Sequence, residues 1–210
     1  MSARFCIQQA DPAAIEVLQR TLSLPRFIAA TLVGRGIDTP QKAQQFLSPS
    51  LDRDWANPYD IPGMAEVVDG LEAALIAHRR ILVFGDFDLD GISAAAVLSR
   101  ALRVLGADVV SFIPRRSDEG YGLSESAIDR FMVHQPDVVI TVDCGISCKE
   151  EAVLLQHRGV EVFITDHHEP GDAVPEDVPV CDPKLDPGNP SSILAGVGVA
   201  LKIVQALGAR

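Results

Sequence analysis

Three aspartates, Asp86, Asp88 and Asp90, stand at alternating positions directly after the apolar run of residues 81–84. A short, continuous apolar run predicts a buried strand. Carboxylates that are delivered together at the end of a strand are costly to bury unless a cation neutralises them. This spacing therefore favours chemistry that uses bound metal ions, with phosphate groups as the natural substrates of such a site.

A second apolar run, residues 160–164, leads into Asp166, His167 and His168. A lone buried histidine is usually structural, but two adjacent histidines after an aspartate at a strand end favour a metal site. Adjacent side chains point in different directions. We therefore expect one imidazole to bind metal and the other to face a substrate phosphate.

A third run, residues 138–142, ends in Asp143, which is followed by Cys144. Alone, Asp143 would equally suit a helix cap. Together with the other two strand ends, it is predicted to bridge two ions. Cys144 has no activating base beside it in sequence, so it is interpreted as a packing residue.

Other interpretations of the aspartate cluster explain less of the sequence. An EF-hand loop that began at Asp86 would need a glutamate at its twelfth position, where Val97 stands, and a helix rather than a strand before it. A phosphoaspartyl-transfer site would leave the paired histidines unexplained. An Asp-rich turn that caps a helix would account for one aspartate at most.

Paired arginines, Arg115 and Arg116, open a polar loop that contains Tyr121. Arginines suit a bidentate grip on phosphate, and the tyrosine offers a face for a base or sugar. A solvated turn built by the two glycines of this loop fits the sequence equally well.

Composition limits the class of protein. The 210 residues are 47% hydrophobic, which is ample for one packed core, and the formal charge of −11 argues against nucleic-acid binding by basic surface charge alone. The four cysteines show no zinc or disulfide spacing, and neither a signal peptide nor a long apolar span is present, so we expect a cytoplasmic protein. The cysteines are Cys6, Cys144, Cys148 and Cys181.

The larger part of the chain is predicted to be an α/β domain. Strand-like and helical runs alternate after Arg80, which indicates a parallel β-sheet flanked by helices, with ligands beyond the carboxyl ends of the strands. The predicted strands are residues 81–84, 109–113, 138–142, 160–164 and 178–181. The predicted helices are residues 92–105, 124–133 and 149–157, and a glycine-opened helix follows from residue 194 to residue 207.

A small helical segment comes before this domain. Residues 26–33 form a helical run after Pro25, and Thr39 with Pro40 is typical of a capped helix start. We expect residues 1–62 to be a helical N-terminal segment with a connector, and residues 63–210 to be a catalytic domain.

The motifs together resemble the DHH phosphoesterase superfamily and, within it, the N-terminal part of the RecJ-type single-stranded-DNA-specific exonucleases. The resemblance covers nearly the whole chain. The matching segments are GDFDLDG at 85–91, RRSDEGYGLS at 115–124, TVDCGIS at 141–147, TDHHEPG at 165–171 and LAGVGVA at 194–200.

The resemblance implies a role for each matching position. Two Mn²⁺ or Mg²⁺ ions would be held by Asp88, Asp90, Asp143 and His167, with Asp86 as a ligand or as a group that orients one. Asp166 would orient the histidines, and His168 with Arg116 would contact the scissile phosphate. The substrate contacts would include Arg115, Arg116, Glu119, Tyr121 and His168.

The implied function is a metal-dependent 5′-to-3′ exonuclease that hydrolyses phosphodiester bonds of single-stranded DNA in DNA repair and recombination. A single-strand-binding protein or a helicase is an expected partner, and a membrane is not. Members of this branch continue to a further aspartate ligand and a second domain, so we expect the catalytic domain to be incomplete at its C-terminus. The alternatives are a non-catalytic scaffold in a replication or repair complex, and a phosphoesterase of short oligonucleotides or cyclic dinucleotides.

Overall fold

The computed structural model describes residues 10–117, 120, 122–171 and 174–209. The chain divides into two compact units, Met1–Trp55 and Ala56–Arg210. Within the described residues, no helix combines the length and the apolar character that crossing a membrane requires.

The smaller unit is helical. It contains α1 (Pro12–Leu22), α2 (Arg26–Gly34), α3 (Pro40–Leu47) and α4 (Leu51–Asp54). The predicted start of α3 is confirmed, because the Thr39 side chain accepts a hydrogen bond from the Lys42 N–H and Pro40 opens the helix. Helices α1, α2 and α3 share a small apolar core, formed by Ile15, Leu18, Ala29, Leu32 and Ala43.

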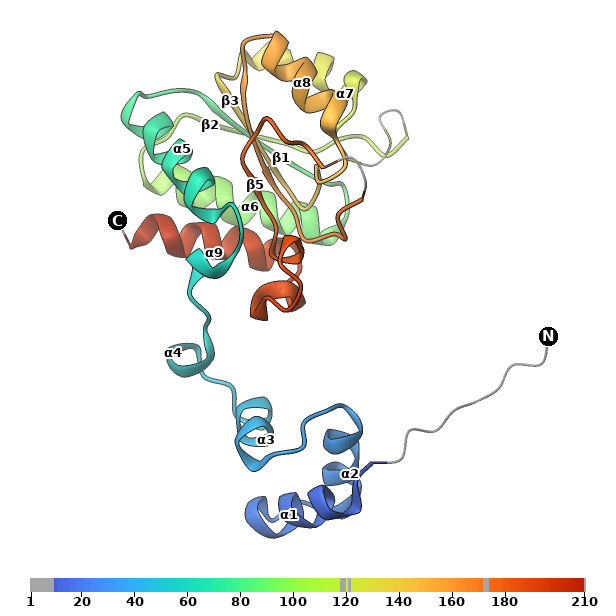
Figure 1. Ribbon diagram of the computed structural model, residues 1–210. Coiled ribbons are helices and arrows are strands. Elements are labelled where there is room, and N and C mark those ends of the chain that lie inside the picture. Colours follow the sequence, from blue (N-terminus) through green and yellow to red (C-terminus); the bar gives the residue numbers. More distant parts are fainter. Residues whose placement is uncertain (1–9, 118–119, 121, 172–173, 210) are drawn as a thin grey trace, which may run out of the picture. The chain divides into compact units, whose positions relative to one another are not determined.

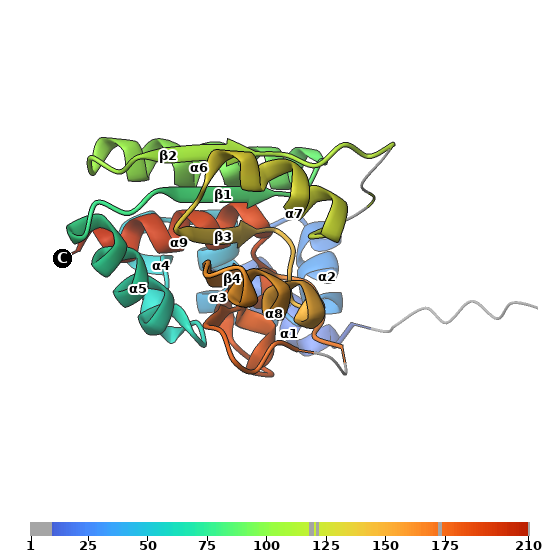
Figure 2. The same cartoon turned by 90° about the horizontal axis from the view of Figure 1, so that it is seen from above.

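The larger unit is built on a five-stranded parallel sheet, as predicted (Figure 1). Its strands are β1 (Ile81–Gly85), β2 (Val109–Phe112), β3 (Val138–Val142), β4 (Glu161–Thr165) and β5 (Val180–Cys181). The spatial order is β2-β1-β3-β4-β5, and Figure 2 shows the first four side by side. The chain leaves β1 toward β2 on one side and returns to β3 on the other. The carboxyl ends of β1 and β3 therefore form a switch point, where α/β sheets bind their ligands.

Helices cover both faces of the sheet (Figure 1). One face packs against α5 (Met64–Ile76), α6 (Leu89–Val104) and α9 (Gly196–Gly208). The other packs against α7 (Glu125–Phe131) and α8 (Lys149–His157). Short 3₁₀ turns complete the unit, at η1 (Pro58–Asp60), η2 (Met132–His134), η3 (Pro183–Leu185) and η4 (Pro190–Ile193).

Helix α6 begins earlier than the predicted residue 92. The Asp88 carboxylate accepts a hydrogen bond from the Gly91 N–H at 3.0 Å, so Asp88 is the N-cap and the helix starts at Leu89. This cap places Asp90 in the first turn of α6.

Helix α5 approaches β4 through a glycine. A Cβ atom added at Gly70 would lie 2.2 Å from the ring of Phe163, a buried residue of β4. The ring therefore fills the space that a side chain at this position of α5 would need, and this contact sets how closely α5 lies on the strand that leads into Asp166.

We predict that Gly70→Ala destabilises the protein by about 1–3 kcal/mol, because overpacking of the core outweighs the gain in helix propensity. Chemical denaturation monitored by circular dichroism measures the change. Gly208→Ala is the matched control, since open space surrounds a Cβ atom there, and it should leave stability equal or slightly higher. Equal stability of the two variants would contradict the packing argument.

Candidate metal centre

The aspartates after β1 lie at the carboxyl edge of the sheet. Asp86 is buried, and its Oδ1 atom has no hydrogen-bond partner among the described residues. Ligand atoms of Asp86, Asp88 and Asp143 all lie within 4.8 Å of one another. The helix cap accounts for Asp88 alone. It leaves the convergence of the three carboxylates unexplained.

Asp143, after β3, is the most constrained of these residues. Its side chain is 3% exposed, and its backbone is in the left-handed region with φ of 63°. The Oδ1 atom lies 3.0 Å from His167 Nε2 and otherwise has no partner of good geometry in the described chain. Asp143 also forms a second group of ligand atoms with His167 and His168, again within 4.8 Å. It therefore stands between two sets of possible ligands.

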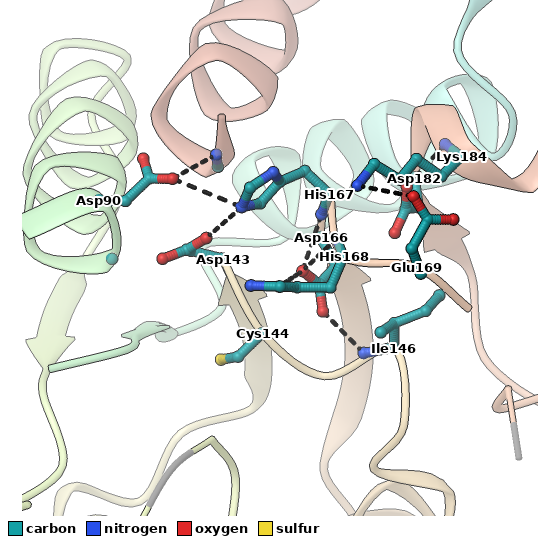
Figure 3. Close-up of polar contacts among 12 residues, drawn as sticks. Asp90, Asp143, Cys144, Ile146, Asp166, His167, His168, Glu169, Asp182 and Lys184 are labelled. Carbon is teal, nitrogen blue, oxygen red and sulfur yellow. Dashed lines mark hydrogen bonds and ion pairs between the residues drawn. The ribbon is translucent and has the colours of Figure 1, made fainter. Parts of the chain in front are cut away.

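Asp166 holds the two histidines in place (Figure 3). Its Oδ1 atom accepts hydrogen bonds from the backbone N–H groups of His167 at 2.7 Å and His168 at 3.2 Å, and lies 2.7 Å from His168 Nδ1. Its Oδ2 atom accepts from the Ile146 N–H at 2.9 Å. An ionised carboxylate can only accept, so His168 must donate from Nδ1.

The two central groups shift each other's protonation. Burial raises the pKa of Asp143, although His167 opposes the shift. The contact with Asp143 raises the pKa of His167 above its ordinary value, and burial opposes it. Without a cation, a proton is therefore favoured between these side chains. Metal binding requires a neutral imidazole and so must release that proton.

Asp90 has two kinds of neighbour. Its two oxygens accept hydrogen bonds from the backbone N–H groups of Gly196 and Val197, at 2.8 Å each. Its Oδ2 atom also lies 3.5 Å from His167 Nε2. The start of α9 therefore contacts this edge of the sheet (Figure 3). The sequence analysis predicted a glycine-opened helix here but named none of its residues as part of the site.

The predicted substrate residues are less completely placed. Arg115 and Arg116 are exposed. The Arg116 guanidinium lies 5.2 Å from the centre of the Phe87 ring, which places it beside residues 86–88, here called the aspartate loop. Glu119 and Tyr121 lie outside the described residues. A cavity of about 410 Å³ opens next to His168. Its lining is Gly122, Leu123, Gly145, Ile146, Ser147, Cys148, Glu151, Asp166, His168 and Glu169.

One residue of this edge was missed. Asp182, directly after β5, is fully buried, and its Oδ1 atom accepts a hydrogen bond from the Lys184 N–H at 2.8 Å. Its Oδ2 atom is buried without a partner among the residues described. The signal was present in the sequence, because the predicted strand of residues 178–181 is followed by Asp182, just as three of the other four strands are followed by an aspartate.

The donor set fits divalent cations. Carboxylate oxygens suit Mg²⁺ and Mn²⁺, and imidazole is an additional ligand for transition metals. Among the described residues, the buried Oδ1 atom of Asp86 has no hydrogen-bond partner, and the Oδ1 atom of Asp143 has only the contact with His167 Nε2 at 3.0 Å. A bound cation would compensate both oxygens. The residues present therefore fit a metal centre.

Comparisons with known proteins agree with this geometry. Residues 80–210 match the DHH family, N-terminal domain. The single-stranded-DNA-specific exonuclease RecJ of Bacillus subtilis is 38% identical over 206 residues, which are 97% of this chain and 26% of that protein. RecJ of Thermus thermophilus is 41% identical over 150 residues, which are 71% of this chain and 22% of that protein.

A solved structure also resembles the chain. The crystal structure of RecJ in complex with Mn²⁺ from Thermus thermophilus matches 97% of this chain and 28% of that chain, with a TM-score of 0.76 and 34% identity. The chain thus spans about a quarter of the length of these relatives. The predicted resemblance to the RecJ-type branch is confirmed. Because the family match covers more than half of the residues, the chain belongs to the DHH family.

Proposed function

We propose that this chain forms the metal-binding part of an exonuclease that hydrolyses single-stranded DNA from its 5′ end. The observation that carries the proposal is the convergence of Asp86, Asp88 and Asp143 on one side and of Asp143, His167 and His168 on the other. The names of its RecJ relatives specify single-stranded DNA, and the resemblance implies the 5′-to-3′ direction.

In this proposal, each side chain acts on the ions or on the phosphate. Asp88, Asp90, Asp143 and His167 hold two Mn²⁺ or Mg²⁺ ions, with Asp143 as the bridge and Asp86 as a ligand or an orienting group. Bound ions of this kind polarise a phosphate and supply hydroxide at neutral pH. No protein nucleophile is then required.

The remaining residues position the substrate. Asp166 fixes His168 through Nδ1, so the His168 Nε2 atom is directed to an oxygen of the scissile phosphate. Arg116 adds a fixed positive charge beside the aspartate loop, which suits a second phosphate oxygen. Arg115, Glu119 and Tyr121 complete the proposed substrate contacts. We also propose a cytoplasmic role in DNA repair and recombination, with a single-strand-binding protein or a helicase as partner.

The cavity beside His168 indicates a path for the strand. Leu123 and Ile146 give the cavity an apolar lining, and the glycines of its lining carry no side chains that would fill it. The cavity therefore has room for a nucleoside next to His168, which is proposed to contact the phosphate. Carboxylates at its rim, Glu151 and Glu169, disfavour a phosphate there and suit the donor groups of a base. We place the nucleoside nearest the scissile bond in this cavity.

The electrostatics of Asp182 also support a cationic centre. Burial raises the pKa of Asp182 to about 6, and the neighbouring Asp166 adds to the shift. His167 and Lys184 oppose the shift without cancelling it.

For the metal-free protein, we predict that Asp182→Asn raises the free energy of unfolding at pH 7. The folded chain holds the Asp182 proton more tightly than the unfolded chain does, so the stability of the parent falls as pH rises from about 4 to about 6. The variant lacks this penalty and should gain up to about 3 kcal/mol at pH 7. The gain should vanish near pH 4.

Urea denaturation in the presence of a chelator, at a series of pH values, measures this difference. Asp177→Asn is the control, because Asp177 is exposed, and it should show no such trend. A difference between parent and Asp182→Asn that does not change with pH would contradict the interpretation.

The second prediction here concerns the bridging ligand. Asp143→Asn keeps the size of the side chain and tolerates the left-handed backbone, but it removes the charge. Titration calorimetry with Mn²⁺ should show affinity reduced by at least about 100-fold, beyond the loss typical of groups that only orient ligands. In a longer protein that contains this chain and cleaves a 5′-phosphorylated single strand, the same change should reduce the release of nucleotides below detection.

Asp108→Asn is the matched control, since Asp108 precedes β2 at the opposite end of the sheet, and it should change neither property. Unchanged Mn²⁺ binding by Asp143→Asn would contradict the site. Tight binding of Mn²⁺ by the parent with no cleavage of any strand would favour the scaffold, and cleavage of short oligonucleotides alone would favour the smaller phosphoesterase.

The third prediction tests the cavity. Ser147 is exposed at its lining, so Ser147→Leu narrows the cavity without disturbing the core. The dissociation constant for a single strand, measured by fluorescence anisotropy, should rise about tenfold, which corresponds to about 1.4 kcal/mol. Mn²⁺ affinity should stay unchanged. Ser126→Leu, an exposed serine outside the cavity lining, is the control; an equal effect of both variants would refute the placement.

A further inference from the structure

The first turn of α9 is bound to an acidic residue of the site. The N–H groups of Gly196 and Val197 donate to the two oxygens of Asp90 at 2.8 Å each. Asp90 lies in the first turn of α6, more than a hundred residues earlier in the sequence. Asp90 therefore links the first turn of α6, to which it belongs, to the first turn of α9, whose amides it accepts.

The same turn of α9 touches Asp143. A Cβ atom added at Gly196 would lie 2.5 Å from Cβ and Oδ1 of Asp143, and 2.7 Å from its Cγ atom. Real Cβ atoms do not approach other atoms this closely, so any side chain at Gly196 must displace the Asp143 carboxylate or the helix. The backbone of Gly196 is helical, so no unusual backbone conformation requires a glycine at this position. The requirement comes from the close contact with Asp143.

We propose that the N-terminus of α9 is a positioning element of the metal centre. Its first two amides orient the Asp90 carboxylate, and the missing side chain of Gly196 gives Asp143 the space in which it faces His167. This inference rests on the proposed function only in that the site binds divalent cations.

Orientation by amides is compatible with metal binding. A carboxylate has about four lone-pair directions, so Asp90 can accept two N–H groups and still present an oxygen to a cation. The positive end of the helix dipole also stabilises the ionised form that a metal needs. The His167 Nε2 atom, 3.5 Å from Asp90 Oδ2, marks the side on which that oxygen is presented.

The rest of α9 is anchored independently of its first turn. Val199, Ile203 and Ala206 are at most 1% exposed and pack in the core beneath the sheet. A change at Gly196 should therefore shift the site before it releases the helix, which makes a functional effect separable from unfolding.

Gly196→Ala tests the proposal, because it adds one methyl group and removes no proposed ligand. The dissociation constant for Mn²⁺, measured by titration calorimetry on the full chain, should rise about 10- to 100-fold. The far-ultraviolet circular dichroism spectrum should stay that of the parent. Gly208→Ala, at the open end of the same helix, is the matched control and should bind Mn²⁺ as the parent does.

A double-mutant cycle keeps the test decisive if Gly196→Ala folds poorly. Asp143→Gly removes the atoms that the new methyl group meets and suits the left-handed backbone at this position. The drop in melting temperature caused by Gly196→Ala should then largely disappear in the Asp143→Gly background. An equal drop in both backgrounds would overturn the proposed contact.

The outcomes separate this inference from the proposed function. If the parent chain binds no Mn²⁺, the proposed metal centre itself fails. If the parent binds Mn²⁺ and a folded Gly196→Ala variant binds it equally well, the centre stands and the positioning role of α9 is refuted.

Discussion

The burial of several like charges at one edge of the sheet is the constraint on which the rest of the structure depends. Asp86, Asp143, Asp166 and Asp182 are each at most 3% exposed. Isolated charges with so little water around them would be prohibitively costly to bury. The negative charge of each of these carboxylates must therefore be compensated by a hydrogen-bond donor or a cation. The kind of compensation differs from one aspartate to the next.

Two kinds of compensation divide the aspartates. Asp88, Asp90 and Asp166 accept hydrogen bonds from backbone N–H groups, which fix their orientation. Asp86 and Asp143, by contrast, each keep a buried oxygen without such a partner. Backbone amides position a carboxylate but carry no full positive charge. The buried oxygen of Asp86 and the Asp143 oxygen that faces His167 are thus where a cation would fit, and the amide-bound carboxylates define its surroundings.

Local sequence patterns predicted most of the fold and the aspartates and histidines that follow the strands, but not the contacts that α9 makes with them. Continuous apolar strands and the acidic or imidazole residues that follow them are short-range signals, so the sheet and the convergence of Asp88, Asp143 and His167 could be foreseen. Asp182 follows the same rule but ends a strand of only two residues. The contact of Gly196 with Asp143 could not be foreseen, because no local pattern records which distant carboxylate a helix start will meet.

The distribution of charge explains why a nuclease of this kind would rely on its centre rather than on its surface. Residues 56–210 carry 24 of the 29 acidic residues but 12 of the 18 basic ones. A surface with this balance repels a polyanion, so counterion release from the strand cannot supply its affinity. In the proposed function, this part of the protein would therefore attract a strand through a few local groups, namely the arginines beside the aspartate loop and the ions between the strand ends. Within residues 56–210, binding of the strand and its cleavage would then depend on the same cations.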